Sequence, residues 1–176
     1  MRSVFCFFLF IFIGSLPLLS TDNFKGKAPV DAYQSAFTVM QYSYIIRGTG
    51  DQTNLSVECW MLQDSSWINW RLPQLKDQAV LKNLIKHEQG HFNIAVIAAK
   101  ELKKTVGAVD FKKPSTEVPR LEKIKRSIDQ KYKDLSDRYD LETFNGRNKE
   151  AQVNWNKHLN NQLKMLENEN VRIYFK

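Results

Sequence analysis

The chain has 176 residues, of which 43% are hydrophobic and 26% are charged. This length suffices for one domain with its own hydrophobic core and is too short for two domains of comfortable size. The formal net charge of +7 favours anionic partners over cationic ones, although a charge of this size also serves solubility alone.

The first twenty residues have the layout of a secretory signal peptide. A positive charge at Arg2 precedes an apolar run from Val4 to Ile13, and small and helix-breaking residues follow. The apolar stretch is shorter than the ~20 residues of a membrane span, and Pro17 interrupts it. We therefore expect residues 1–20 to direct the protein to the periplasm or out of the cell. An N-terminal anchor that is not cleaved is the alternative.

The cysteine content and the predicted export exclude an internal disulfide and disfavour nucleic acid as a partner. Removal of the first twenty residues takes Cys6 away and leaves Cys59 alone, which excludes an internal disulfide. Cys59 lies in LSVECWML, which is typical of a strand, and a lone cysteine there is expected to be an inert core residue. Export also argues against nucleic acid as a partner of this basic chain, whereas an anionic envelope surface fits its charge.

The first half of the chain is rich in β-forming residues. Residues 21–32 are polar and basic and are predicted to form a flexible leader, so that the domain proper spans residues 33–176. FTVMQYSYIIRG and TNLSVECWMLQ then follow, separated by the turn residues GTGDQ. SWINWRL predicts a third short strand. Together these stretches predict a small antiparallel sheet.

Helical periodicity begins after Pro73 and continues through KDQAVLKNLIKHEQGHFNIAVIAAKELKK. One broad apolar stripe of this stretch consists of Leu81, Leu84, Ile85, His91, Ile94, Ala95, Ala98 and Leu102. Apolar residues at spacings of three and four, with further apolar residues around the histidines, predict a long and largely buried helix.

Two further helices are predicted after the break VGAVDFKKPSTEVP. Ser115 or Thr116 is expected to cap the second helix, RLEKIKRSIDQKYKDLSDRYD, with Pro119 in its first turn. The third helix, KEAQVNWNKHLNNQLKMLENE, follows an interruption at Gly146. Their apolar faces consist of Leu121, Ile124, Ile128, Tyr132 and Leu135, and of Ala151, Trp155, Leu159, Leu163 and Leu166. The predicted fold class is therefore α+β, a small antiparallel N-terminal sheet followed by three helices.

Two histidines lie four residues apart in the first predicted helix, in the stretch His87-Glu88-Gln89-Gly90-His91. Residues four apart share one face of a helix, so both imidazoles can point at one metal ion. Tetrahedral zinc accepts two imidazoles, needs a third protein ligand and keeps one position for water. Glu88 can reach that water as a general base, which is the H-E-x-x-H arrangement of zinc metallopeptidases.

The same pattern also has a purely structural interpretation. Both histidines lie near the apolar stripe, where they could be core or boundary residues, and Glu88 could be a solvated helix residue. Three features favour the metal site. Gly90 in mid-helix costs ~1 kcal/mol relative to alanine, and the close approach of another backbone or of a substrate would compensate. The flanking residues are apolar on both sides, and hydrolytic zinc enzymes commonly work outside the cell.

The blocks HEQGHFNIA, AAKELKK and YDLETFNGRNKEAQVNW resemble a bacterial family, the domain of unknown function 922 family, whose members are described as secreted zinc-dependent proteases. The resemblance runs from about Tyr33 to Leu166. It implies a zincin-like metallopeptidase domain with His87 and His91 as zinc ligands and Glu88 as the catalytic base. The proteolytic role of this family is itself largely inferred from the histidine motif.

The third zinc ligand is the point where the sequence departs from the family. The usual form is Thr-x-His-Gly or Thr-x-His-Ser, but this chain has Asn145 in place of the histidine. Asparagine is a weak, neutral oxygen donor for zinc. Two carboxylates close by, Asp140 and Glu142, could each take its place. If neither does, the chain binds metal weakly and has lost catalysis.

Residues around this block carry further expectations. Tyr139 precedes Asp140, and its phenol could stabilise an oxyanion if it faces the metal. His158 lies about one position from the apolar stripe of the third helix and is expected at the helix surface rather than on the metal. Trp155 is expected in the core. Without a metal, Asn-Gly is an ordinary turn and Tyr-Asp an ordinary helix end.

The leading functional hypothesis is an exported peptidase that binds one zinc ion and cleaves a peptide or protein substrate with metal-activated water. The alternative is a catalytically inactive, zincin-like envelope protein that binds a protein or a cell-wall polymer. A third interpretation is a structural helical module without metal. The third ligand discriminates between the first two: a carboxylate within coordination distance of both histidine nitrogens favours the enzyme, and Asn145 in an incomplete site favours the binder.

Overall fold

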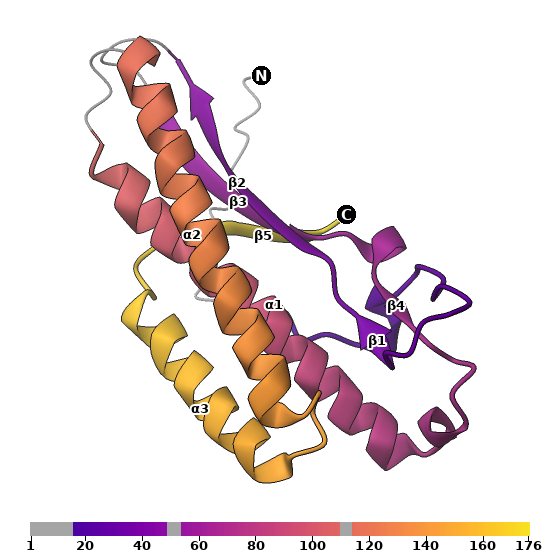
Figure 1. Ribbon diagram of the computed structural model, residues 1–176. Coiled ribbons are helices and arrows are strands. Elements are labelled where there is room, and N and C mark those ends of the chain that lie inside the picture. The colour runs from indigo at the N-terminus through magenta and orange to yellow at the C-terminus, as the bar shows by residue number, and fades with distance from the viewer. Residues whose placement is uncertain (1–15, 49–53, 110–113) are drawn as a thin grey trace, which may run out of the picture.

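The computed structural model describes residues 16–48, 54–109 and 114–176 and confirms the predicted α+β class (Figure 1). Its strands are β1 (Ala36–Phe37), β2 (Met40–Arg47), β3 (Asn54–Met61), β4 (Trp67–Ile68) and β5 (Arg172–Phe175). Its three long helices are α1 (Gln78–Gly107), α2 (Pro114–Thr143) and α3 (Lys149–Met165). Most of the predicted signal peptide, residues 1–15, lies outside the described residues. None of the helices in the described ranges is both long and apolar enough to cross a membrane.

The strands form two small sheets. β2 and β3 pair as the predicted antiparallel hairpin, with Met40 opposite Met61. β5 extends this sheet by pairing in parallel with β3, an addition that the sequence analysis does not anticipate. The predicted third strand exists as β4, but it pairs with β1 in a separate two-stranded sheet. A run of four residues such as β5 shows too little alternation to be predicted as a strand.

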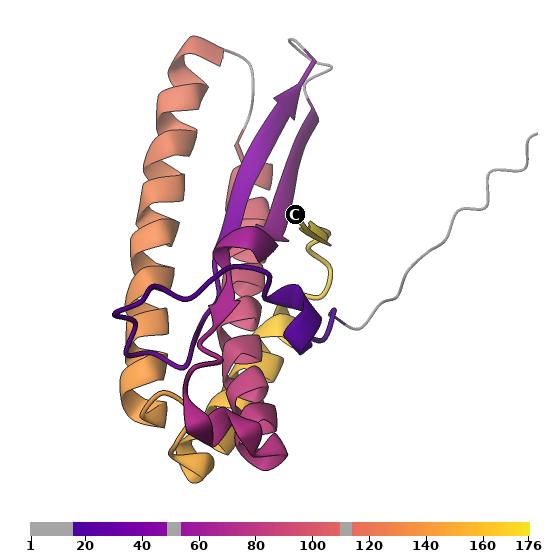
Figure 2. The same cartoon turned by 90° about the vertical axis from the view of Figure 1, so that its right-hand side faces the viewer.

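Helix α1 is the central element of the fold (Figures 1 and 2). It contacts β2 and β3 as well as α2 and α3. Because neighbours cover it on several sides, its buried residues exceed the single predicted stripe and include Phe92, Val96, Ile97, Ala99 and Val106. The predicted faces of the other two helices are confirmed by the burial of Leu121, Ile128, Tyr132, Trp155 and Leu159.

Two helix boundaries differ from the prediction. The predicted cap at Ser115 or Thr116 is wrong, since α2 already begins at Pro114, and Pro119 lies inside the helix rather than in its first turn. Proline suits the first helical position, where its missing N–H would have no intrahelical partner in any case. Helix α3 is capped by Asn148, whose side chain accepts from the N–H of Ala151 at 3.1 Å, and it ends earlier than predicted, at Met165.

The segment before β1 packs on the domain. Leu19 and Phe24 are both buried in the core. The N–H of Leu19 donates to Gln89 Oε1 at 2.7 Å, and Gln89 Nε2 donates to the carbonyl of Pro17 at 3.3 Å. Further along, the N–H of Gly26 donates to the carbonyl of Ser66 at 2.8 Å. Residues 17–19 therefore contact the helix that carries the histidine motif, and Gly26 contacts the loop after β3, although the sequence suggests a signal-peptide end and a flexible leader there.

This packing predicts that the five residues 16–20 stabilise the domain. A chain beginning at Thr21 should have a free energy of unfolding about 2–4 kcal/mol lower than a chain beginning at Leu16, because it loses the buried Leu19 side chain and a hydrogen bond to Gln89. Chemical denaturation of the two chains measures the difference. Leu18→Ser in the longer chain is the matched control, since Leu18 is 83% exposed. Equal midpoints for the two chains would contradict the prediction.

Candidate metal centre

Helices α1 and α2 bring together three side chains that could hold a metal ion, namely His87, His91 and Asp140. Asp140 Oδ1 lies 3.0 Å from His87 Nε2 and 2.9 Å from His91 Nε2. The two histidines are one helical turn apart on α1, and Asp140 lies in the last turn of α2. Of the candidates for a third donor, the structure therefore places Asp140 beside both rings.

The donor set fits a metal ion such as zinc. The three donor atoms all lie within 4.8 Å of one another. A tetrahedral zinc ion about 2.0–2.2 Å from nitrogen and oxygen donors would hold those donors about 3.3–3.5 Å apart. The two nitrogen–oxygen contacts at 2.9 and 3.0 Å need to open by only a few tenths of an ångström. Imidazole and carboxylate donors also suit other divalent metals, so the donor set does not fix the identity of the ion.

A second layer of hydrogen bonds orients both imidazole rings. His87 Nδ1 lies 3.2 Å from Gln152 Oε1, and His91 Nδ1 lies 2.9 Å from Ser136 Oγ. With an Nδ1–H donating to these oxygens, Nε2 of each ring, which contacts Asp140 in this structure, is the nitrogen that would bind an ion. Outer partners of this kind fix the tautomer and the ring orientation of metal-binding histidines.

The charges of the cluster stabilise each other. Burial alone would raise the pKa of Asp140, but hydrogen bonds from His87 and His91 hold this pKa well below its usual range. Burial would lower the pKa of His91, but its hydrogen bond to Asp140 and the charge of Glu88 outweigh this effect and raise it. The side chain of His87 is only 3% exposed, whereas that of Asp140 is 40% exposed. A ligand from solvent therefore reaches the cluster on the Asp140 side.

Glu88 is buried beside the histidines, with 4% of its surface exposed. Its Oε2 accepts a hydrogen bond of 2.6 Å from Thr38 Oγ1, in the short segment between β1 and β2. This bond orients the carboxylate and occupies one of its two oxygens. The other oxygen has acceptor capacity left for a substrate or a water molecule.

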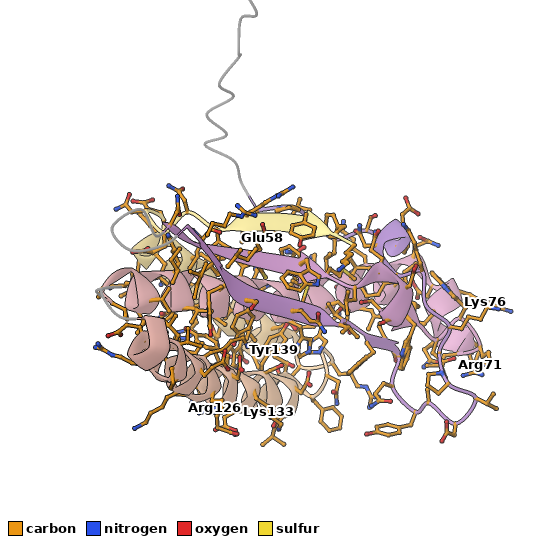
Figure 3. The ribbon with its side chains drawn as sticks, turned by 90° about the horizontal axis from the view of Figure 1, so that it is seen from above. Glu58, Arg71, Lys76, Arg126, Lys133 and Tyr139 are labelled. Atoms are coloured by element: carbon orange, nitrogen blue, oxygen red, sulfur yellow. The ribbon has the colours of Figure 1, made fainter. Side chains whose placement is uncertain are left out.

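Tyr139 is fully buried and contacts the histidine helix. Figure 3 labels it between α2 and the strands. Its ring stacks on that of His87 with centroids 4.7 Å apart and an interplanar angle of 10°. Its hydroxyl donates to the carbonyl of His87 at 2.9 Å and accepts from Gln152 Nε2 at 2.7 Å. Burial raises the pKa of this hydroxyl. The predicted role as an oxyanion donor does not fit this geometry, because both hydrogen bonds of the phenol are used to hold α1 and α3 in place.

Two glycines of the motif blocks allow close contacts. A Cβ at Gly90 would lie 2.1 Å from the hydroxyl oxygen of Tyr139, so the close approach is made by a tyrosine side chain and not by the predicted backbone or substrate. Gly146 has a φ of +78°, and a Cβ there would lie 2.8 Å from Cβ of His87. Gly90 therefore packs on Tyr139, which positions His87, and Gly146 packs on His87 itself.

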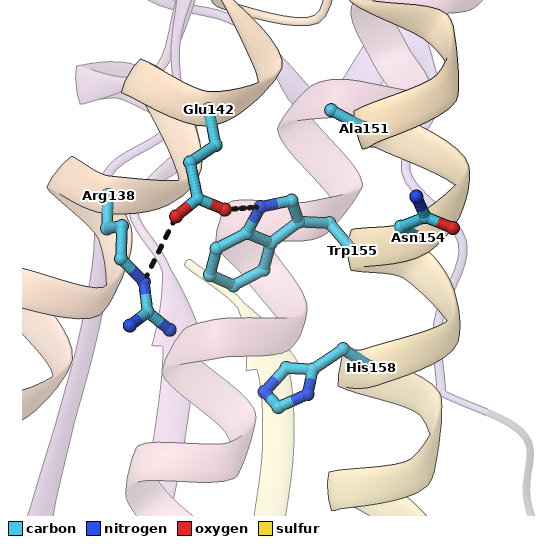
Figure 4. Close-up of a pocket in the computed structure, with 6 residues that line it drawn as sticks. All are labelled: Arg138, Glu142, Ala151, Asn154, Trp155 and His158. Atoms are coloured by element: carbon cyan, nitrogen blue, oxygen red, sulfur yellow. Dashed lines mark hydrogen bonds and ion pairs between the residues drawn. The ribbon is translucent and has the colours of Figure 1, made fainter.

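The other ligand candidates lie elsewhere. Glu142 Oε2 accepts from Trp155 Nε1 at 2.8 Å and forms the wall of a pocket between α2 and α3 (Figure 4). Residues two apart on a helix point in nearly opposite directions, so Asp140 and Glu142 cannot both face α1. His158 lines the same pocket, with its ring 5.7 Å from that of Trp155. Asn145 lies in the turn after α2 with a φ of +52°. Within the described residues, the hydrogen-bond partners of the two histidine rings do not include Asn145.

Three residues that support the site are absent from the sequence predictions of function. Ser136 lies four residues before Asp140, and this helical spacing could have indicated it. Gln152 lies in the block YDLETFNGRNKEAQVNW of the family resemblance. The sequence of this block does not reveal that the Gln152 amide contacts both Tyr139 and His87. Thr38 contacts Glu88 across fifty positions of the chain, and no local pattern marks it.

The fold and the cluster define an α+β protein whose central helix offers two histidines, and whose next helix offers an aspartate, to a metal ion. Residues 63–146 match the family described as "Bacterial protein of unknown function (DUF922)", which confirms the family resemblance seen in the sequence. This range includes all three donor residues, Glu88 and both glycines. No curated protein and no solved structure matches the chain.

Proposed function

We propose that the protein is an exported zinc-dependent peptidase. The observation that carries the proposal is the position of Asp140 Oδ1, within 3.0 Å of Nε2 of both motif histidines. This contact supplies the third donor that the missing family histidine leaves open. The alternative of an inactive binder presupposes an incomplete site, and the Asp140 contact favours the enzyme instead.

Zinc is the proposed metal because the arrangement resembles catalytic zinc sites. Such sites combine three protein ligands with one open position, whereas structural zinc sites use four protein ligands. Here His87, His91 and Asp140 would hold the ion, and the exposed side of Asp140 would leave access for solvent and substrate. When bound there, zinc would act as a Lewis acid that activates water and polarises the peptide carbonyl.

The residues of the chain would carry out the proton transfers. Glu88 would take a proton from water as the water oxygen bonds to the carbonyl carbon. The same carboxyl group would give this proton to the amine nitrogen as the carbon–nitrogen bond breaks. Thr38 would keep the carboxylate in place through its hydrogen bond to Oε2. Gln152 and Ser136 would keep the two imidazoles directed toward the ion.

The direct test is metal-dependent proteolysis by the purified chain. An unfolded protein substrate should be cleaved, cleavage should stop with a chelator, and added zinc should restore it. Mass spectrometry of the fragments identifies new peptide termini. Absence of cleavage by zinc-loaded protein across a diverse peptide library would contradict the proposed activity. Recovery of the protein from the periplasm or medium, compared with a chain whose first fifteen residues are deleted, tests export separately.

A further inference from the structure

A second pocket, of about 220 Å³, lies between the first half of α1 and the start of α3. Its polar lining consists of Asn83 and Lys86 from α1 and of Lys149, Gln152 and Asn156 from α3, and Gly146 and Val153 complete it. The pocket therefore forms where the histidine helix meets the helix that carries Gln152. Neither the proposed peptidase mechanism nor the family match assigns it a role.

The charged residues that line this pocket are both cationic. Lys86 and Lys149 both line it, and none of its lining residues carries a carboxylate. Within the described part of the chain, neither Lys86 nor Lys149 takes part in an ion pair. Asn156 Oδ1 accepts from Gln152 Nε2 at 2.9 Å, which leaves the Asn156 amino group to donate to a ligand. A compact anion satisfies such a set of donors best.

The pocket and the metal cluster share His87. Gln152 lines the pocket and contacts Nδ1 of this imidazole at 3.2 Å, while Nε2 of the same ring faces Asp140. Gly146, also in the lining, packs directly on the His87 side chain. An extended peptide advances about 3.3 Å per residue. The pocket and the cluster therefore lie on opposite sides of the His87 ring, a separation that a few residues of an extended peptide can span.

We propose that this pocket holds a carboxylate of the peptide substrate, so that the peptidase prefers substrates with an acidic group close to the scissile bond. The inference rests on the proposed peptidase function. The carboxylate comes either from an aspartate or glutamate side chain or from the free C-terminus of the peptide. Both have the same chemistry, and the substrates in the test separate them.

The test compares kcat/KM for matched peptides cleaved by the zinc-loaded full chain. The first pair differs by glutamate or glutamine near the cleaved bond, and the second pair by a free or amidated C-terminus. We expect the wild-type protein to favour one acidic member by about tenfold, mainly through KM, as for a charge-assisted hydrogen bond. Lys86→Met and Lys149→Met should each reduce this preference without slowing the neutral peptide. Lys82→Met, one turn before Lys86 and outside the pocket lining, should leave the preference unchanged.

A binding measurement separates this inference from the proposed activity. N-acetylglutamate is titrated into chelator-treated protein, and the backbone amide signal of Gly146 is followed by NMR. A shift that saturates in wild type and disappears in Lys86→Met supports the pocket even if no peptide is cleaved. Cleavage without an acidic preference, together with no saturable shift, would overturn the inference and leave the peptidase standing.

Discussion

Replacement of Glu88 by glutamine should lower kcat for peptide hydrolysis by roughly 10²–10⁴-fold while the zinc content stays unchanged. Glutamine has nearly the same shape and can still accept the hydrogen bond from Thr38 that the structure shows at 2.6 Å. It cannot take a proton from water, so only the general-base step is lost. Steady-state kinetics with one peptide substrate, together with metal analysis of the same preparations, measures both properties.

The matched control for this prediction is Glu142→Gln. Glu142 is also a carboxylate near the cluster, but it faces Trp155 in the pocket between α2 and α3. Its substitution should leave kcat within about twofold of wild type, because it takes part in no step of the proposed mechanism. A Glu88→Gln variant as active as wild type would remove Glu88 from the reaction and with it the mechanism proposed above.

The second large effect is expected for stability, at Gly90. Alanine at this position would place a methyl group 2.1 Å from the Tyr139 hydroxyl oxygen and 2.4 Å from its Cζ. The ring would have to move, and its hydrogen bonds to the His87 carbonyl and to Gln152 would break. Overpacking of this kind outweighs the better helix propensity of alanine, so we expect the free energy of unfolding to fall by about 3 kcal/mol. The variant should also bind zinc more weakly, because the His87 ring loses its stacking partner.

Gly107→Ala provides the comparison on the same helix. Gly107 is the last residue of α1, and a Cβ there would have no atom within 4 Å. This variant should be as stable as wild type or slightly more stable, by up to about 1 kcal/mol. Thermal and chemical denaturation of both variants and of wild type measures these differences in the free energy of unfolding. Equal stability of Gly90→Ala and Gly107→Ala would show that the contact with Tyr139 does not constrain Gly90.

Local patterns in the sequence predict the parts of the site that belong to one helix. The four-residue spacing of His87 and His91 is sufficient to place both rings on one face, and the unusual Gly90 indicates a close approach from outside the helix. Asp140 is one of two carboxylates proposed as the third donor, and the predicted apolar face of α2 already separates the two. On that face Ile128 and Tyr132, both buried in the structure, are followed at four-residue spacing by Ser136 and Asp140, whereas Glu142 points away from it.

Tertiary contacts determine the rest, and the sequence contains no local signal for them. Tyr139 was a reasonable oxyanion donor by position, but its phenol is used to join α1 to Gln152 on α3. The parallel pairing of β5 with β3 joins the two ends of the domain, across more than one hundred residues. The packing of Leu19 on Gln89 likewise depends on a distant helix and brings part of the predicted leader into the domain.

The most direct test of the account is the zinc content of purified wild-type, Asp140→Ala and Glu142→Ala proteins after equilibration with a low free zinc concentration. We expect about one zinc ion per chain in wild type and in Glu142→Ala, and a large loss in Asp140→Ala. Circular dichroism of each preparation verifies that the helices are intact. No bound zinc in wild type, or full zinc content in Asp140→Ala, would contradict a metal centre formed by His87, His91 and Asp140.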